Sequence, residues 1–538
     1  MAKIFYPDFF NDVFGPIMQP GSSGSFAGTS RVGHAAHYLL AAPLTDVKIR
    51  FNKSDRKHLE NLGNMMDDRG YLGGLLGYNP DDYQLFFAHE NARKQNLSYS
   101  FSSLDYDTPY PGSVQFDLID QQANRAQLIG QSVGGGMILI YEINGYPVRW
   151  SADTYLTLIE AVTLDQLPSS AELESVESLV DYHWLEKTGS HERGLLLESS
   201  APLTHLADHL HFIPQRIVTI PALLPVVTTL ERQPQLFSTI PEWIAYANDN
   251  HISFLEAAIH YEQAFSAWSK EAILEYFEVI AGVLNHQIHA LEEIGYDQVE
   301  DTEMLPVYGK YWNTYKQSGK VLQDSLASRI MDYAFSTNAK IPGVKIVPGP
   351  MGTGGGYLFS ALEGVREFRG YSHEKLIEGL IIAAMLGAIA FTHAKASGAS
   401  GCVGESGICC AMASGAITWM AGGSGEAVEH AASMALQANI GIPCDPIPGG
   451  LEFPCLTRTV RAAITAPLYA DMALAGIDPL IPYHEVLFAI EKNRQVNSEA
   501  LCGYECGVNC TLTAAKCRQF LQGSVMKDRL TYVAPKIS

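Results

Sequence analysis

Three cysteines stand in loop-forming stretches of the chain and are suited to holding an iron–sulfur cluster. Cys402 lies in GASGCVGES, Cys444 in GIPCDPIPGG and Cys455 in EFPCLTR, so glycine or proline accompanies each thiol. Such stretches let backbone N–H groups approach a cluster and hydrogen-bond to its sulfides. Three thiolates hold three irons of a four-iron cluster and leave the fourth iron open for a substrate, as three protein ligands do at a catalytic zinc ion. The pattern indicates a catalytic cluster.

The residues by themselves leave other roles for the thiols open. Zinc is the competing metal, although no two of these three cysteines have the short spacing typical of a zinc site. Buried structural cysteines are a further alternative. Cys409 and Cys410 lie where a helix of small residues begins, and we expect them to serve packing. Near the C-terminus, Cys502, Cys506 and Cys510 are spaced by four residues and could hold a second metal. The role of these three cysteines and of Cys517 stays open.

The elements that must position these thiols are helices. From residue 240 the chain has apolar residues at helical spacing, with Ser269 as an expected cap, and alanine and glycine are dense enough for helices to pack closely. An uncharged apolar run at 379–391 is too short to span a bilayer and predicts a buried helix. We therefore expect residues 240–538 to form an all-helical domain that binds the cluster.

The preceding residues have a different texture. Residues 1–165 mix glycine loops with alternating apolar runs, and MILIYEING at 137–145 reads as a strand leading into a turn, which together predict an α+β domain. Residues 166–239 are less regular, and we expect a connecting or small regulatory α/β module there. The expected fold class is multidomain, with an α+β N-terminal domain followed by an all-α catalytic domain that binds the cluster.

Composition and charge narrow the class of protein. The chain has 538 residues, 47% hydrophobic and 17% charged, which is ordinary for a globular protein of two or three domains. Its net charge of −22 argues against nucleic acid or an anionic membrane as a partner. The segment MAKIFYPDFF lacks the basic and apolar regions of a signal peptide, so we expect a cytoplasmic protein whose thiols stay reduced. We expect a small-molecule substrate and a homodimer.

The motifs around the thiols indicate a family. GCVGESGICCAMASGA, GEAVEHAASMALQANIGIPCDPIPGGLEFPCLTR and the upstream SVGGGM resemble the iron–sulfur-dependent L-serine dehydratases, or L-serine ammonia-lyases, and the intervals between the cysteines fit as well. The resemblance covers most of the chain, as a β-like region fused to an α-like region. It implies a [4Fe-4S] cluster bound by Cys402, Cys444 and Cys455, with one iron open to the substrate.

The same resemblance implies a substrate pocket, which this chain has altered. The residues expected to line the pocket are Ser22, Ser23, Ser25, Asp68 and Ser132. In the family's Ser-Ser-Ser-His-Thr loop, Ser25 stands here at the histidine and Phe26 at the threonine. Met65 stands at the histidine of a second motif, Gly-His-Gly-Thr-Asp, and Met351 replaces an asparagine. These changes predict a more apolar pocket, suited to a different or larger β-substituted acid.

The resemblance does not identify the general base. His34 and His37 in RVGHAAHYLL are candidate replacements, although lone histidines are usually structural or exposed. The glycine-rich stretches GPMGTGGGY and SVGGGM also suggest a phosphate-binding loop, as in pyridoxal-phosphate dehydratases. No Walker signature accompanies them, and no lysine stands in a recognisable Schiff-base motif, so close backbone packing is the better explanation.

The predicted activity is that of an iron–sulfur hydro-lyase and ammonia-lyase of amino acid metabolism. The substrate would be a β-hydroxy amino acid or a related β-substituted acid, which loses water and releases ammonia at the open cluster iron. Two alternatives stay open: β-elimination of sulfide, as in a cysteine desulfidase, and a non-catalytic iron–sulfur redox sensor that kept the cluster and lost the histidines. The exact substrate and its stereochemistry are not determined by the sequence.

Overall fold

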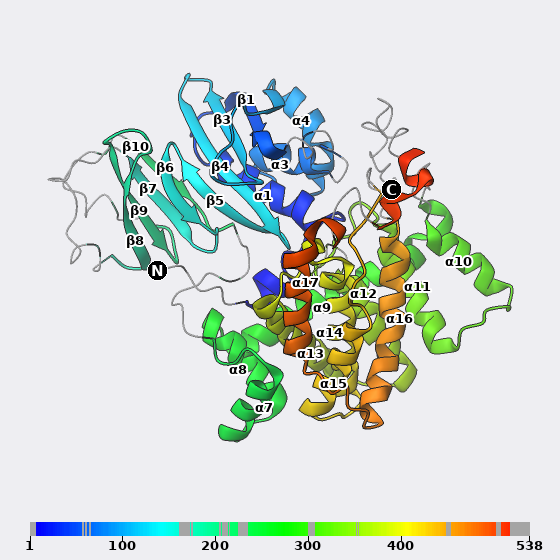
Figure 1. The fold of residues 1–538 in the computed structure, drawn as a ribbon. Helices are drawn as coiled ribbons and strands as arrows, with labels where there is room; N and C mark the ends of the chain where they lie inside the picture. Colours follow the sequence, from blue (N-terminus) through cyan, green and yellow to red (C-terminus); the bar gives the residue numbers. More distant parts are fainter. Residues whose placement is uncertain are drawn as a thin grey trace. The chain divides into compact units, whose positions relative to one another are not determined.

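A computed structural model describes most of the chain (Figure 1). The described residues are 7–55, 59, 62–63, 66–160, 173, 176–203, 206, 214, 216–223, 227, 235–299, 307–350, 352, 354–447, 453–501 and 507–516. They group into two compact units: Ser23–Arg232, called here the α/β unit, and Met1–Ser22 with Gln233–Ser538, called the helical unit. An α/β region with two sheets therefore precedes a mostly helical region, which confirms the expected fold class. The three-part division at residues 165 and 239 stays a prediction.

The first sheet of the α/β unit has six strands in the order β2-β1-β3-β4-β5-β6. Its strands are β1 (Leu44–Phe51), β2 (Ser98–Ser103), β3 (Val114–Asp120), β4 (Arg125–Gly134), β5 (Met137–Ile143) and β6 (Tyr146–Trp150). β1 and β2 run parallel, and the other neighbours are antiparallel. The strand predicted at 137–145 is β5, and the turn after it holds Asn144 and Gly145 in left-handed conformations, as a tight hairpin requires.

The second sheet has four antiparallel strands in the order β10-β7-β9-β8. They are β7 (Tyr155–Glu160), β8 (Leu179–Glu186), β9 (Arg193–Ser199) and β10 (Arg216–Ile220), the last of which begins the RIVTIPALLPVV segment. Leu156, Leu158 and Leu196 pack into the same core as the residues of the first sheet. One hydrophobic core therefore contains residues of both sheets of this unit.

Three helices of the α/β unit are α1 (Thr29–His37), α3 (Asp67–Leu75) and α4 (Ala88–Lys94). Glycines bring α1 and α3 into backbone contact. A Cβ added at Gly33 would lie 2.2 Å from the Tyr71 carbonyl oxygen, and one added at Gly74 would lie 1.9 Å from the Ser30 oxygen. Only glycine allows this approach, which fixes the loop before α1 relative to Asp68 in the first turn of α3. A π-helical turn, η2 (Ser23–Gly28), precedes α1, and a 3₁₀ turn, η4 (Tyr83–Phe87), precedes α4.

The described residues of the helical unit consist mainly of α-helices. Its helices are α7 (Ile240–Asp249), α8 (Phe254–Ser266), α9 (Lys270–Ile294), α10 (Tyr308–Gln317), α11 (Ser325–Ala339), α12 (Gly354–Arg369), α13 (His373–His393), α14 (Ser406–Met420), α15 (Gly425–Gln437), α16 (Cys455–Leu474) and α17 (Tyr483–Leu501). The Ser269 hydroxyl accepts a hydrogen bond from the Ala272 N–H at 3.2 Å, so it caps α9 as predicted. Ser253, Ser372 and Ser424 cap three other helices in the same way.

The core of this unit is built around α13. Within the described part of the chain, α13 is the one helix that is long and apolar enough to cross a membrane. However, 78% of its most apolar 18-residue stretch is buried inside the protein. Small residues let its neighbours come close: a Cβ at Gly415 of α14 would lie 2.5 Å from Leu386 Cδ1 of α13. The buried helix predicted at 379–391 is therefore confirmed, and close packing explains the density of alanine and glycine.

The N-terminal segment packs with the helical unit. Met18 exchanges two backbone hydrogen bonds with Ile346, at 2.8 and 3.0 Å. Phe9 stacks on Tyr261, with ring centroids 5.8 Å apart, and Phe10 packs against Phe277. Aromatic packing of this kind buries a large apolar area, which explains why these residues group with helices far away in the sequence.

Candidate active site

The three predicted cluster ligands lie in loops that begin or interrupt helices. Cys402 opens a 3₁₀ turn, η8 (Cys402–Gly404), just before α14, and Cys455 is the first residue of α16. The Cys402 N–H donates to the Ile442 carbonyl oxygen at 2.8 Å, which ties the first loop to the loop that carries Cys444. The Cys444 N–H donates to the Leu501 oxygen at 2.7 Å. Backbone hydrogen bonds thus hold two of the thiols' loops together.

Glycines leave room around these thiols. A Cβ at Gly398 would lie 2.8 Å from Cys444 Sγ and 3.4 Å from Glu405 Oε1. Gly401 has φ +88°, and a Cβ there would lie 2.6 Å from the Ile442 oxygen. A larger residue at position 398 would fill the space beside the Cys444 thiol, and one at position 401 would press on the loop that carries it. Cys402 is buried, whereas Cys444 and Cys455 are half-buried.

Charged side chains connect the three thiols. The Cys444 thiol donates to Glu405 Oε2 at 3.7 Å, and Glu405 also acts electrostatically on Cys402. Burial raises the pKa of the Cys402 thiol, while its hydrogen bond with Ser406 lowers it. Burial lowers the pKa of Arg458, but Asp445, Cys402 and Cys455 outweigh that effect and raise it. Arg458 therefore lies close enough to two of the thiols to favour their thiolate forms.

The spacing of the thiols bears on the choice between zinc and a cluster. Among the described residues, Cys402, Cys444 and Cys455 do not form a group whose ligand atoms all lie within 4.8 Å of one another. Ligands of a single zinc ion, at about 2.3 Å from the metal, would lie about 3.8 Å apart. In a cluster each thiolate binds a different iron, so the sulfurs are spaced more widely. A cluster therefore accommodates three thiols at a wider spacing than a single zinc ion does.

The other buried thiols of this region serve packing, as expected. The Cys409 thiol donates to the Gly349 carbonyl oxygen, and a Cβ at Gly354 would lie 2.9 Å from its sulfur. Burial raises the pKa of Cys410 to about 11, so this thiol stays protonated. The glycine-rich stretch at 349–356 is thus a place of close packing around Cys409. Met351, which replaces an asparagine of the family, lies outside the described residues.

In the α/β unit, the predicted substrate loop is folded against strand β4. The Ser132 hydroxyl donates to the Gly24 oxygen at 2.7 Å, and a Cβ at Gly28 would lie 2.1 Å from the Ser132 oxygen. Ser132 therefore holds the loop in place. Ser23 is buried in this loop, and Ser25 is half-buried, as is Ser22 just before it.

Asp68 is held by a histidine that sequence reasoning missed. His89 of α4 places Nε2 at 2.7 Å from Asp68 Oδ2 and Nδ1 at 2.8 Å from the Tyr99 hydroxyl on β2. Burial by itself would raise the pKa of Asp68, but the hydrogen bond from His89 and the charges of Arg69 and His89 hold it below its ordinary value. Asp68 Oδ1 is buried and has no hydrogen-bond partner among the described residues.

The geometry holds Asp68 as an anionic carboxylate. Nε2 of His89 faces the Asp68 carboxylate, and Nδ1 faces the Tyr99 hydroxyl. Both imidazole nitrogens are then engaged, so His89 positions Asp68. No local pattern points to His89, because it lies 21 residues beyond Asp68 on another helix. Met65, the other altered position, lies outside the described residues.

His34 and His37, the candidate replacement bases, take part in packing. His34 is buried and stacks on Tyr38, with ring centroids 5.2 Å apart. Burial, together with the charge of His37, lowers the pKa of His34 to about 4. His37 Nδ1 lies 2.9 Å from the Leu75 oxygen. These contacts favour structural roles for both histidines.

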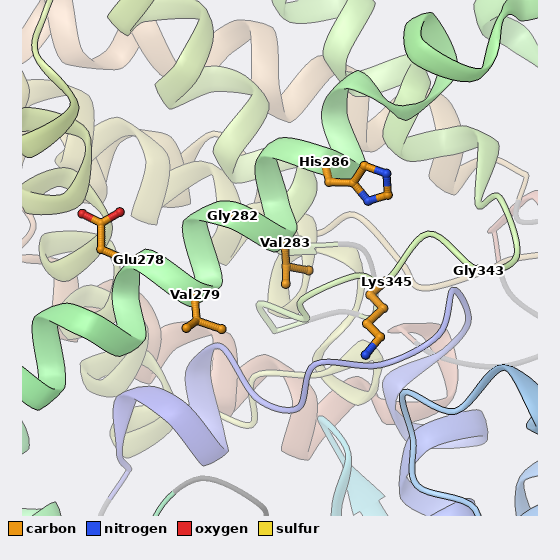
Figure 2. Close-up of a pocket in the computed structure, with 7 residues that line it drawn as sticks. All are labelled: Glu278, Val279, Gly282, Val283, His286, Gly343 and Lys345. Atoms are coloured by element: carbon orange, nitrogen blue, oxygen red, sulfur yellow. The ribbon is translucent and has the colours of Figure 1, made fainter.

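A separate cavity of about 470 Å³ lies along α9 (Figure 2). Figure 2 shows His286 projecting from α9 and Lys345 from the loop that faces it. The lining residues are Glu278, Val279, Gly282, Val283, His286, Gly343 and Lys345. None of the predicted site residues is among them.

Comparisons with known proteins agree with these features. Residues 249–508 match the family model described as serine dehydratase alpha chain. The chain is 29% identical over 270 residues to L-serine dehydratase, alpha chain, of Peptoniphilus asaccharolyticus, which covers 49% of this chain and 91% of the relative. It is 30% identical over 269 residues to a probable L-serine dehydratase alpha chain of Bacillus subtilis, covering 49% of this chain and 88% of the relative. The beta chain from Peptoniphilus asaccharolyticus matches at 29% identity over 150 residues, 28% of this chain and 66% of its own length.

The fold, the cysteine loops and these matches together define a lyase of the serine-dehydratase type. The chain belongs to the iron–sulfur L-serine dehydratase family. Relatives of both the separate alpha chain and the separate beta chain match this single polypeptide.

Proposed function

We propose that this protein is a [4Fe-4S]-dependent lyase that removes water, and then ammonia, from a β-hydroxy amino acid or a related β-substituted acid. The observation that carries the proposal is the set of Cys402, Cys444 and Cys455 in neighbouring loops, with glycine at 398 leaving space beside the Cys444 thiol. These three thiolates would hold the cluster. When bound, a cluster with one open iron supplies a Lewis acid that assists loss of the β-hydroxyl group.

The chain's own residues would bind and orient the substrate. An amino acid carries an ammonium group, and the carboxylate of Asp68 is a suitable acceptor for it because it stays ionised. The hydroxyls of Ser22, Ser23 and Ser25 are suited to donating hydrogen bonds to the substrate carboxylate. Ser132 keeps their loop in position.

The steps that follow the elimination of water do not need the cluster. Loss of the α-proton and of the β-hydroxyl group as water leaves an enamine, which tautomerises to an imine. Water then hydrolyses the imine to a 2-keto acid and ammonia. A 2,3-dihydroxy acid would instead leave an enol, which tautomerises to the 2-keto acid without release of ammonia.

The substrate preference follows from the altered pocket. Ser25 and Met65 cannot carry the positive charge that histidines offer. If both positions face the substrate, L-serine is turned over poorly and a ligand with a bulkier or more apolar β-substituent is turned over better. Restoring histidine at both positions leaves the thiols untouched, so serine turnover should rise while the iron content stays the same. Efficient serine turnover by the unaltered protein would contradict the shifted preference.

The test of the function uses protein isolated without oxygen. We expect 2-keto acid and ammonia from at least one β-hydroxy amino acid, with serine and larger analogues compared, and loss of activity in air that ferrous iron and a thiol restore. Sulfide release from cysteine as the main activity would support a desulfidase instead. A brown protein that turns over none of these compounds would support a redox sensor. A cytoplasmic location and a homodimer stay predictions.

A further inference from the structure

A second cluster of metal-ligand side chains lies on the four-stranded sheet of the α/β unit. Asp181 and His183 of β8 and Glu198 of β9 place one ligand atom each within 4.8 Å of one another. We propose that these three residues bind a divalent transition-metal ion, of the kind that takes nitrogen and oxygen ligands, such as Mn²⁺ or Zn²⁺. This site goes beyond the proposed lyase activity and does not involve the cysteines.

The strand register sets the three side chains on one face. Asp181 and Glu198 are direct partners across the antiparallel β8–β9 pair. His183 stands two residues after Asp181 on β8, and side chains two apart on a strand point to the same face. The three ligands therefore converge because of the sheet geometry, and no loop has to fold over them.

The two carboxylates make a cation favourable at this position. Like charges directly opposite each other on neighbouring strands destabilise a sheet, and Glu198 is only 2% exposed. Glu198 Oε2 accepts a hydrogen bond from the Thr154 hydroxyl at 2.9 Å. A divalent ion between the two strands would attract both carboxylates and offset their mutual repulsion.

The distances fit a shared ion. His183 Nε2 lies 3.2 Å from Asp181 Oδ2. Two ligands at about 2.0–2.2 Å from one metal, separated by an angle between octahedral and tetrahedral, lie about 3.0–3.4 Å apart. Asp181 Oδ1 accepts from the Tyr182 N–H at 2.9 Å, which directs the other oxygen toward His183. An imidazole in the set favours a transition metal over Ca²⁺ or Mg²⁺.

Buried residues behind Glu198 orient its carboxylate. Thr154 is 1% exposed, and the Trp150 indole N–H lies 3.2 Å from its hydroxyl oxygen and 3.1 Å from its carbonyl oxygen. Such outer hydrogen bonds fix the direction of a metal ligand. The side chains of Asp181 and His183 are 44% and 49% exposed, so an ion can enter from solvent and take water as its remaining ligands. A bound ion would join the edge strand β8 to β9.

The test measures Mn²⁺ binding to the full-length protein, isolated without oxygen, by the electron paramagnetic resonance signal of free Mn²⁺. Mn²⁺ prefers oxygen and nitrogen ligands to thiolates, so the cysteines do not compete for it. We expect one saturable site per chain, displaced by Zn²⁺. H183Q and D181N should each weaken the site at least tenfold. Both side chains are half-exposed, so these variants should fold normally.

A matched control comes from the same hairpin. His191 Nδ1 lies 3.8 Å from Glu186 Oε1, an exposed histidine–carboxylate pair, and H191Q should leave Mn²⁺ binding unchanged. Mn²⁺ should also raise the thermal unfolding midpoint of the wild type and of H191Q, and not that of H183Q. Equal affinity in H183Q and the wild type, or no saturable binding by the wild type, would overturn the proposal. None of these outcomes depends on whether serine is a substrate.

Discussion

The cysteine loops of the helical unit and the pocket loops of the α/β unit differ in how they keep their chemistry. The three cysteines Cys402, Cys444 and Cys455 match cysteines of the motifs that the chain resembles, and glycine leaves room beside the Cys444 thiol. Around Asp68, two histidines of the family are replaced, and the carboxylate is held by His89 from another helix. Few side chains can replace a thiolate at an iron–sulfur cluster, whereas a hydrogen bond to a carboxylate can come from any element that reaches it. The ligand set is therefore the more constrained of the two.

The largest expected effect is the loss of the cluster when a ligand is removed. Protein isolated without oxygen should contain about four irons and four sulfides per chain. Cys402→Ser, Cys444→Ser and Cys455→Ser should each lose most of the iron and all turnover, because serine is a poor ligand for iron in this cluster. Cys409→Ser is the matched control, since a serine hydroxyl can still donate to the Gly349 oxygen. Zinc in place of iron in the wild type would contradict the assignment of Cys402, Cys444 and Cys455 to an iron–sulfur cluster.

The second effect concerns the ion pair behind the thiols. Asp445 is 0% exposed and is paired with Arg458, which also donates to the Pro443 oxygen at 2.7 Å. Arg458→Met leaves this buried carboxylate without its cation, so the free energy of unfolding should fall by about 3 kcal/mol. The additional change Asp445→Asn should restore part of the loss. Chemical denaturation of the wild type and of the two variants measures the free energy of unfolding. An Arg458→Met protein as stable as the wild type would show that the loop does not need the ion pair.

The third effect is a pH dependence confined to the α/β unit. Burial lowers the pKa of His34 from 6.5 to about 4. Folding favours the neutral form of His34, so its contribution to the free energy of unfolding is fully present above pH 6.5 and is lost as the pH falls toward 4. Between pH 7 and pH 5 the free energy of unfolding should therefore fall by about 2 kcal/mol. The difference in unfolding free energy between the wild type and His34→Gln should shrink by that amount, and a constant difference would argue against a neutral, buried His34.

The smallest effect tests whether His89 positions Asp68. His89→Gln should lower kcat/KM for the best substrate about tenfold, since a hydrogen bond to a charged group contributes about 1.5–3 kcal/mol. The pKa of Asp68 should rise when this bond is lost, so the acidic limb of the pH profile should move to higher pH. His37→Gln, which changes a contact to the Leu75 oxygen, should move neither quantity. A fall in kcat/KM with no shift of the acidic limb of the pH profile would assign His89 a purely structural role.

Much of the fold could be predicted because it depends on local pattern. The alternation at 137–145 forms β5, the apolar run at 379–391 lies in α13, and Ser269 caps α9. These features depend on a few neighbouring residues and on the side-chain period of strands or helices. The packing of residues 7–22 with the helical unit has no such local signal, because it depends on Phe9 and Phe10 meeting Tyr261 and Phe277.

The sequence by itself determined the fold class, the family and the candidate cluster ligands, because the thiols stand in short motifs whose residue types and intervals resemble those of the family. Only the tertiary structure decided that His89 holds Asp68 and that Glu198 meets Asp181 and His183. The physical reason is the same in both cases. Helix packing and strand register bring together side chains from separate elements, and no periodicity along the chain records which residues will meet.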